Sequence, residues 1–225
     1  PREAAHCGFD TDAFALDRRQ SRKKLLAELK LGERAKVLLF VGRLGPDDAL
    51  GKEVNQKNPK FALEVARELV QCDQNYHLLL AGGGQRQRQL FEAQTVDWGI
   101  HENIHFLGIR HDIPQLMTGS DLLLFPSRAE GLGMVAVEAQ ASGLPVLTSD
   151  TTPRECQVVN EMVRFLPLGD GPARWANEAR SITDQSLPDH QTCNHAVVNS
   201  GFSIRNSAAK LLEVYSGKRA SNQVA

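Results

Sequence analysis

The chain has 225 residues and a mass of 24.8 kDa, which suggests one domain with some additional length. Its 41% hydrophobic and 24% charged residues are typical of a globular protein and exclude a disordered or fibrous class. The formal net charge is −1, so we expect no basic surface for nucleic acid or an anionic membrane, and an anionic ligand needs a local site. The apolar runs are much shorter than the ~20 residues of a membrane span, so no transmembrane segment is expected.

Short apolar runs alternate with helical patterns along most of the chain. The first 16 residues lack periodicity, and residues 17–31 predict a helix that Gly32 ends. The predicted strands are residues 36–41, 76–81, 103–107, 121–125, 144–148 and 162–166, and the predicted helices between them are residues 61–70, 84–97, 113–118 and 132–141. Residues 184–201 are polar and poorly periodic, and residues 203–215 predict a final amphipathic helix.

This alternation predicts an α/β fold, a Rossmann-like doubly wound parallel sheet of about six strands with helices on both faces. We expect a linker and leading helix over residues 1–32, a nucleotide-sugar-binding domain over 33–185, and a helical segment and tail over 186–225. Ligands of such sheets bind beyond the carboxyl ends of the strands. The loops that should carry function are therefore residues 42–58, 82–85, 108–112, 126–131 and 149–155.

The cysteines and histidines do not predict a metal site. Cys7, Cys72, Cys156 and Cys193 are far apart in the sequence, and Cys193 with His195 is the only Cys/His cluster. No secretion signal is recognisable, so we expect reduced thiols, a cytoplasmic location and no metal.

Two glutamates with the spacing E-x7-E surround the start of a predicted helix. Glu130 precedes the helix and Glu138 is predicted to lie about two turns into it, while Gly131 and Gly133 let the backbone approach a ligand. The unsatisfied N–H groups and dipole of the helix favour phosphate, and carboxylates accept hydrogen bonds from hydroxyls. A nucleotide sugar has this pattern of sugar, diphosphate and ribose.

The loop after the first strand supplies the positive charge that a diphosphate needs. Arg43 provides a forked donor and Lys57 a mobile point charge. The two are fourteen residues apart, and Lys52 is the alternative to Lys57 within the intervening segment.

Several motifs in order resemble one family. They are GRL at residues 42–44, KN at 57–58, FLG at 106–108, P-S-x-x-E-G at 126–131 and the E-x7-E pair. Together they look like the C-terminal, donor-binding domain of family 4 (group 1) retaining glycosyltransferases of GT-B fold, most similar to the exopolysaccharide-biosynthesis type. The resemblance covers residues 36–166, and residues 7–14 look like the family's interdomain linker.

The resemblance implies roles for individual residues. Arg43, next to Gly42, and Lys57 match the basic pair on the diphosphate, and Glu130 matches the carboxylate that contacts the donor sugar. Three further matches are Gly131, Leu132 and Gly133 with the loop that meets sugar and phosphate, Glu138 with the contact to the ribose hydroxyls, and Gly108, Ile109 and Arg110 with the segment flanking the base.

The resemblance also implies an activity and partners. These are retaining transfer of a hexose, with UDP-hexose as the expected donor, to a glycan or lipid-linked acceptor, without a cofactor or divalent metal, in the cytoplasm and often near the inner membrane face. The N-terminal acceptor domain of the family is missing from the sequence, which starts at Pro1, so a fragment and a non-catalytic nucleotide-sugar-binding module are both open. A nicotinamide-dependent dehydrogenase is disfavoured because no G-x-G-x-x-G follows the first predicted strand.

Three features remain open between structural and functional interpretations. Residues 82–84 are either a plain glycine turn or part of the site, and Ser149–Thr152 are either turn residues or face the sugar. Arg110 is either an exposed charge or a donor contact. Gly143 is expected to end the helix that carries Glu138.

Overall fold

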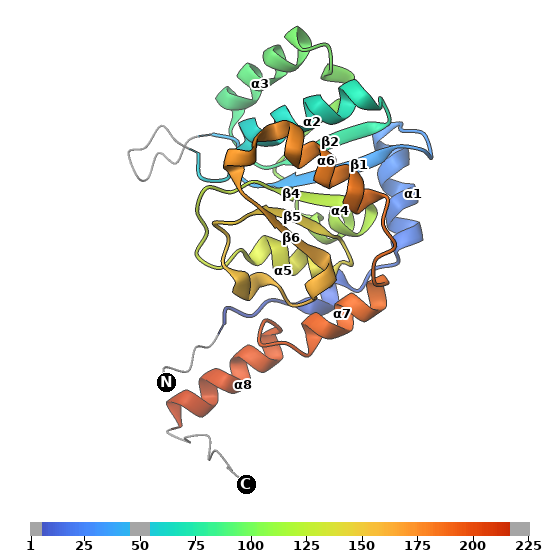
Figure 1. The fold of residues 1–225 in the computed structure, drawn as a ribbon. Coiled ribbons are helices and arrows are strands. Elements are labelled where there is room, and N and C mark those ends of the chain that lie inside the picture. Colours follow the sequence, from blue (N-terminus) through green and yellow to red (C-terminus); the bar gives the residue numbers. More distant parts are fainter. Residues whose placement is uncertain (1–5, 46–54, 217–225) are drawn as a thin grey trace.

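A computed structural model of the chain describes residues 6–45 and 55–216 and shows six parallel strands in one sheet (Figure 1). The strands are β1 (Lys36–Val41), β2 (Tyr76–Ala81), β3 (Ile104–Gly108), β4 (Leu122–Phe125), β5 (Val146–Ser149) and β6 (Val163–Leu166). Their order is β3-β2-β1-β4-β5-β6, with the first strand at the centre and a reversal of winding beside it. The predicted Rossmann-like sheet is confirmed.

Helices cover both faces of the sheet. They are α1 (Arg18–Leu29), α2 (Pro59–Cys72), α3 (Gln85–Asp97), α4 (Ile113–Gly119), α5 (Met134–Ala141), α6 (Gly171–Thr183), α7 (His190–Val198) and α8 (Ile204–Tyr215). Helices α2, α3 and α6 pack on one face, and α1, α4, α5 and α7 pack on the other. The continuous apolar strands follow from this arrangement, because alternate side chains enter two different cores.

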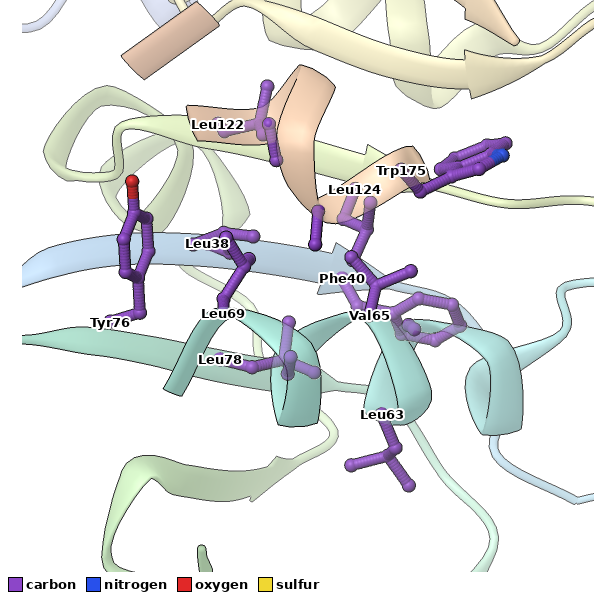
Figure 2. Close-up of a cluster of buried hydrophobic side chains, with 14 of the residues drawn as sticks. Leu38, Phe40, Leu63, Val65, Leu69, Tyr76, Leu78, Leu122, Leu124 and Trp175 are labelled. Carbon is purple, nitrogen blue, oxygen red and sulfur yellow. The ribbon is translucent and has the colours of Figure 1, made fainter. Parts of the chain in front are cut away.

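One core lies between the sheet and helices α2 and α6 (Figure 2). Leu38 and Phe40 of β1 point into it with Leu124 of β4, and Val65 of α2 closes it from the helix side. Trp175 of α6 is fully buried there, and its Nε1 donates a hydrogen bond to the Pro167 carbonyl at 2.9 Å. Burial of these side chains fixes the sheet on which the functional loops stand.

Helix ends explain most of the differences from prediction. Gly143 has φ +63° and ends α5, as predicted, with Leu144 N–H donating to the Ala139 carbonyl at 2.9 Å. Helix α1, however, ends earlier than predicted, because Lys30 rather than Gly32 takes the left-handed conformation. Helix α5 begins only at Met134, so Glu138 lies a little over one turn into it.

The polar segment that lacked periodicity contains a helix. In α7, the side chain of Asp189 accepts a hydrogen bond from Thr192 N–H at 2.9 Å and caps the helix. Only Cys193 and Val197 of this helix are buried, four residues apart, so its apolar pattern is very short. Tertiary packing on α5 rather than periodicity therefore produces α7.

The N-terminal end of the described chain lies beside the start of α8, a helix that extends away from the sheet (Figure 1). Phe9 forms a β-bridge with Ser203, and the Ser207 hydroxyl donates to the His6 carbonyl. Apolar side chains of α8 such as Leu212 and Tyr215 are exposed. Within the described residues, no helix combines the length and the apolar character that crossing a membrane requires.

Candidate active site

A cavity of about 610 Å³ lies at the carboxyl edge of the sheet, where the fold predicts a ligand. It is formed by the ends of β1 and β2 and the loop after β3, and its lining includes Gly42, Arg43, Gly45, Gly82, Gly83, Gly84, Ile109, Arg110 and Ile113. Four of the predicted site residues, Gly42, Arg43, Ile109 and Arg110, therefore come together. Gly108, the last residue of β3, lines an adjoining hollow of about 320 Å³. The two cavities share Ile109 and the glycines at positions 82–84.

Close backbone approach explains one of the glycines after β2. A Cβ atom on Gly82 would lie 1.8 Å from the carbonyl oxygen of Gly42. The backbones are tied together here, since Gly42 N–H donates to the Ala81 carbonyl at 3.0 Å and Gly82 N–H to the Gly108 carbonyl at 2.8 Å. Gly82 is thus required by the fold, and the flat glycine surface also forms a wall of the cavity.

Lys57 and Glu130 form an ion pair between two of the predicted loops. The Lys57 Nζ lies 2.6 Å from Glu130 Oε1, although the residues are 73 positions apart. The Glu130 side chain is only 10% exposed and that of Lys57 29%. The ammonium also lies 5.2 Å from the Phe125 ring centre, at the end of β4. A cation and a carboxylate are therefore held together at the carboxyl edge.

Lys57 also contacts the glycine that begins the cavity wall. A Cβ atom on Gly42 would lie 3.1 Å from Lys57 Cγ, so the lysine stem passes directly beside Gly42. This contact connects the Lys57–Glu130 pair with the cavity that contains Arg43. Lys52, the alternative to Lys57, lies outside the described residues, as does most of the segment between Arg43 and Lys57.

The loop that carries Glu130 is anchored on the loop that carries Lys57. Arg128 N–H donates to the Gln56 carbonyl at 2.7 Å, and Arg128 Nη2 lies 3.3 Å from Asn58 Oδ1. Asn58 is buried with φ +56°, a conformation that asparagine tolerates better than most residues. Its Nδ2 has no hydrogen-bond partner among the described residues.

Different constraints act on the two glycines of the E-x7-E segment. Gly133 has φ +76°, and a Cβ atom there would lie 2.9 Å from Thr152 Cγ2, so the fold requires glycine. Gly131 has no neighbouring atom within 4 Å of a Cβ position and no positive φ. The fold therefore tolerates a side chain at Gly131, and the open space there is available to a ligand. Leu132 between them is partly buried against the core below α5.

Glu138 occupies a largely buried position on α5. Burial raises the pKa of its carboxyl group to about 7. Burial is the only cause of this shift, in contrast to Glu130, which has Lys57 as a partner. The carboxyl group is therefore poised between its neutral and ionised forms near neutral pH.

Arg110 is engaged by two carboxylates of the protein itself. Its guanidinium lies 2.6 Å from Asp112 and 2.6 Å from Glu28 of α1, and these partners raise the pKa of Arg110 above its usual value. The side chain is thus neither a simple exposed charge nor an uncommitted cation. We interpret it as a strut that holds the loop after β3 in place on α1.

Comparisons with known proteins point to one family. The family model described as "Glycosyl transferases group 1" matches residues 35–185, about two thirds of the chain. The UDP-Gal:alpha-D-GlcNAc-diphosphoundecaprenol alpha-1,3-galactosyltransferase of Escherichia coli is 28% identical over 214 residues, which cover 92% of this chain and 52% of that protein.

The chain belongs to the group 1 glycosyltransferases.

Solved structures of glycosyltransferases share the fold. The Anabaena HepE complex with UDP and glucose has a TM-score of 0.74 and 21% identity, covering 95% of this chain and 56% of that one. The C-terminal domain of the group 1 glycosyltransferase LpcC from Francisella tularensis has a TM-score of 0.60 and 17% identity, covering 91% of this chain and 98% of that domain. The fold is thus one half of a GT-B fold, and the chain spans about half the length of the curated relative and of HepE.

The described residues contain no group of three or more His, Cys, Asp or Glu side chains that could hold a metal ion. None of the four cysteines is paired in a disulfide, and Cys156 and Cys193 are buried.

Two features of the site were not predicted from the sequence. The anchoring role of Asn58 depends on its left-handed backbone conformation, which the sequence does not reveal. For the hydroxyl-rich segment after β5, the sequence is compatible both with a turn and with a contact to the sugar. In the structure, Ser149 and Thr151 bond to the Ser127 carbonyl behind Glu130. The signals available in the sequence were Ser127 within the P-S-x-x-E-G motif and the separate Ser/Thr-rich segment at residues 148–152.

Proposed function

We propose that this chain is the donor-binding half of a retaining hexosyltransferase that binds a nucleoside-diphosphate hexose, with UDP-hexose as the expected donor. The observation that carries the proposal is the Lys57–Glu130 pair, 2.6 Å apart at the carboxyl edge of the sheet. It supplies a cation for phosphate beside a carboxylate for a sugar hydroxyl.

The diphosphate would lie between Arg43, Lys57 and the first N–H groups of α5. These groups hold positive charge at fixed positions, where negative charge develops on the leaving diphosphate. In this role Arg43 and Lys57 stabilise the departing group. Donor binding would draw Lys57 toward phosphate and leave Glu130 to accept a hydrogen bond from the sugar.

From the diphosphate, the ribose would reach Glu138, and the base that it carries would reach the loop after β3. Glu138 would accept hydrogen bonds from the ribose hydroxyls, and the backbone of Gly108 and Ile109 would flank the base. Ile109 is 75% exposed and lies next to Gly83. A Cβ atom on Gly83 would lie 3.5 Å from the Cδ1 atom of Ile109. Such an exposed apolar side chain beside a flat backbone favours contact with a planar ring.

The acceptor is proposed from the relatives. The name of the Escherichia coli galactosyltransferase describes a diphosphoundecaprenol acceptor and a UDP-linked donor, and HepE was solved with UDP and glucose. A glycan or lipid-linked acceptor, met by a second half like that of the relatives, fits this chain.

Calorimetry of the 225-residue chain with UDP, GDP and ADP tests the proposal. We expect saturable binding of UDP, weakened by Glu138→Ala, whereas Glu130→Ala mainly reduces discrimination between UDP-sugars. A folded sample that binds none of the three nucleotides would overturn the proposal. Equal UDP affinity in wild type and Glu138→Ala would remove the ribose role alone.

A further inference from the structure

Four hydroxyl side chains at the end of β5 form a connected cluster, Thr148, Ser149, Thr151 and Thr152, which we call the hydroxyl cluster. Thr148 Oγ1 and Thr152 Oγ1 are 2.8 Å apart, as are Ser149 Oγ and Thr151 Oγ1. Thr152 Oγ1 also lies 3.3 Å from Ser149 Oγ and joins the two pairs. Thr148, Ser149 and Thr152 are buried, and Thr151 is exposed.

The hydroxyl cluster holds the backbone that leads to Glu130. Thr148 Oγ1 donates to the Phe125 carbonyl at 3.1 Å, at the end of β4. Thr151 Oγ1 donates to the Ser127 carbonyl at 2.9 Å, and Ser149 Oγ donates to the same oxygen. The cluster therefore grips the loop three and five residues before Glu130.

Thr152 also supports the other end of the E-x7-E segment. Its Cγ2 methyl group packs against Gly133, where a Cβ atom would come within 2.9 Å of it. Gly133 is the residue from which α5 and its N–H groups begin. The buried side chain of Thr152 thus contacts both the other hydroxyls of the cluster and the start of α5.

The chemistry of the hydroxyl cluster favours support over ligand contact. Each hydroxyl has a single proton to donate. The protons of Thr148, Ser149 and Thr151 go to carbonyl oxygens, so Thr152 is the hydroxyl that donates within the cluster, to Thr148 Oγ1 at 2.8 Å. Removing the Thr152 hydroxyl would leave buried oxygens with a missing partner and loosen the connection between the two pairs. Buried, mutually bonded hydroxyls are placed to orient the loop.

We propose that the hydroxyl cluster, with Thr152 at its centre, is a positioning device that sets the Glu130 loop for recognition of the donor sugar. The inference rests on the proposed donor function, and it assigns these residues a role in positioning the loop rather than in contacting the donor. It predicts that the cluster affects binding of the sugar more than binding of the nucleotide. The reason is that Ser127 and Gly133 flank Glu130 in the sequence, whereas the proposed contacts with the base lie after β3.

The Thr152→Val variant tests the role, since it removes the hydroxyl and keeps the branched shape. The matched control is Thr118→Val, because Thr118 is also buried and its hydroxyl donates to the Pro114 carbonyl at 2.8 Å on α4, away from the loop. Thr152→Ser restores the hydroxyl and serves as the rescue. If Thr152→Val fails to fold, Ser149→Ala tests the same connection.

Two measurements on these variants separate positioning from general stability. The first is hydrogen exchange of residues 126–133 in the unliganded 225-residue chain, which we expect to quicken in Thr152→Val and not in Thr118→Val. The second is the ratio of Kd for UDP to Kd for UDP-glucose, which we expect to fall about fivefold in Thr152→Val and to recover in Thr152→Ser.

The outcomes are distinct for the two proposals. A wild-type chain that binds neither ligand overturns the proposed function, while the exchange measurement still decides whether the cluster holds the loop. Unchanged exchange in a folded Thr152→Val sample overturns the positioning role. Quickened exchange with an unchanged affinity ratio, in a chain that binds both ligands, overturns its connection to sugar recognition.

Discussion

The two edges of the sheet use the same kinds of charged groups for different purposes. At the amino edge, a cavity of about 930 Å³, larger than the cavity at the carboxyl edge, is lined by residues from the starts of α1 and α7 and the segments before β4 and β5. Several charged groups around this cavity form ion pairs and hydrogen bonds within the fold. Asp121 accepts from Val37 N–H at 2.8 Å and pairs with Arg18 at 3.1 Å and Arg22 at 2.9 Å.

The carboxyl edge leaves several polar groups incompletely satisfied. Asn58 Nδ2 and Ser127 Oγ are buried without hydrogen-bond partners among the described residues, and Glu138 is half-buried with a raised pKa. Among the described residues, Arg67 Nε of α2 and Gln115 Nε2 of α4 also lack partners. The carboxyl edge differs because it combines unpaired atoms with a carboxyl group of raised pKa, a combination that is typical of functional sites. Cavity size alone favours the amino edge, whereas the state of the polar groups favours the carboxyl edge.

The largest expected effect concerns a glycine that the carboxyl edge requires. Gly82→Ala should lower the free energy of unfolding by on the order of 3 kcal/mol, because the new methyl group collides with the Gly42 carbonyl. Gly131→Ala, in open space, should leave stability unchanged and weaken UDP-glucose binding. Chemical denaturation and calorimetry measure the two effects, and equal stability losses would contradict the distinction between these glycines.

Removal of the paired lysine should have the next largest effect. Lys57→Ala should weaken UDP binding roughly tenfold or more, since a hydrogen bond to a charged group contributes about 1.5–3 kcal/mol. Lys60→Ala is the matched control, because Lys60 lies three residues further on and its exposed side chain pairs with Glu64 at 3.9 Å. Similar losses in both variants, measured by calorimetry, would reduce the role of Lys57 to general charge.

The raised pKa of Glu138 predicts a pH dependence of donor binding. The ionised carboxylate is the better acceptor for ribose hydroxyls, and with a pKa of about 7 it becomes the main form as the pH rises. Affinity for UDP-glucose should therefore increase between pH 6 and pH 8, by up to about tenfold. Glu138→Gln should abolish the dependence, and an affinity that falls with pH would show that repulsion between carboxylate and diphosphate dominates.

The amino edge should affect stability without affecting binding. Asp121→Ala removes the partner of two arginines and of the Val37 N–H, so we expect a loss of about 2 kcal/mol in unfolding free energy. Its affinity for UDP should equal that of the wild type, measured where both remain folded. A clear loss of affinity would break the contrast between the edges.

Much of this architecture was predictable because it depends on local patterns. The strands β1 and β2 have the predicted limits, since each is a continuous apolar run followed by glycine. The pairing of Lys57 with Glu130 was not predictable from spacing, because they are 73 positions apart with several helices and strands between them, and the sheet order brings them together. The resemblance to a family supplied their roles, and the structure supplied their contact.

The unpredicted parts depend on tertiary contacts or on single backbone angles. Helix α7 has too few buried residues to show a period, and Asn58 and Lys30 adopt left-handed conformations that glycine-based rules do not identify. The burial that raises the pKa of Glu138 likewise arises from packing around α5. The residues of the candidate site could be proposed from sequence motifs, whereas the supports behind them depend on tertiary packing.

Mapping of UDP binding by amide chemical shifts tests the central claim most directly. On titration of the 225-residue chain, we expect the largest shifts at residues 42–45, 57–58 and 130–134, at the carboxyl edge. Residues 15–19 and 185–194, around the larger cavity, should not move. Saturable shifts confined to those amino-edge residues would contradict the account.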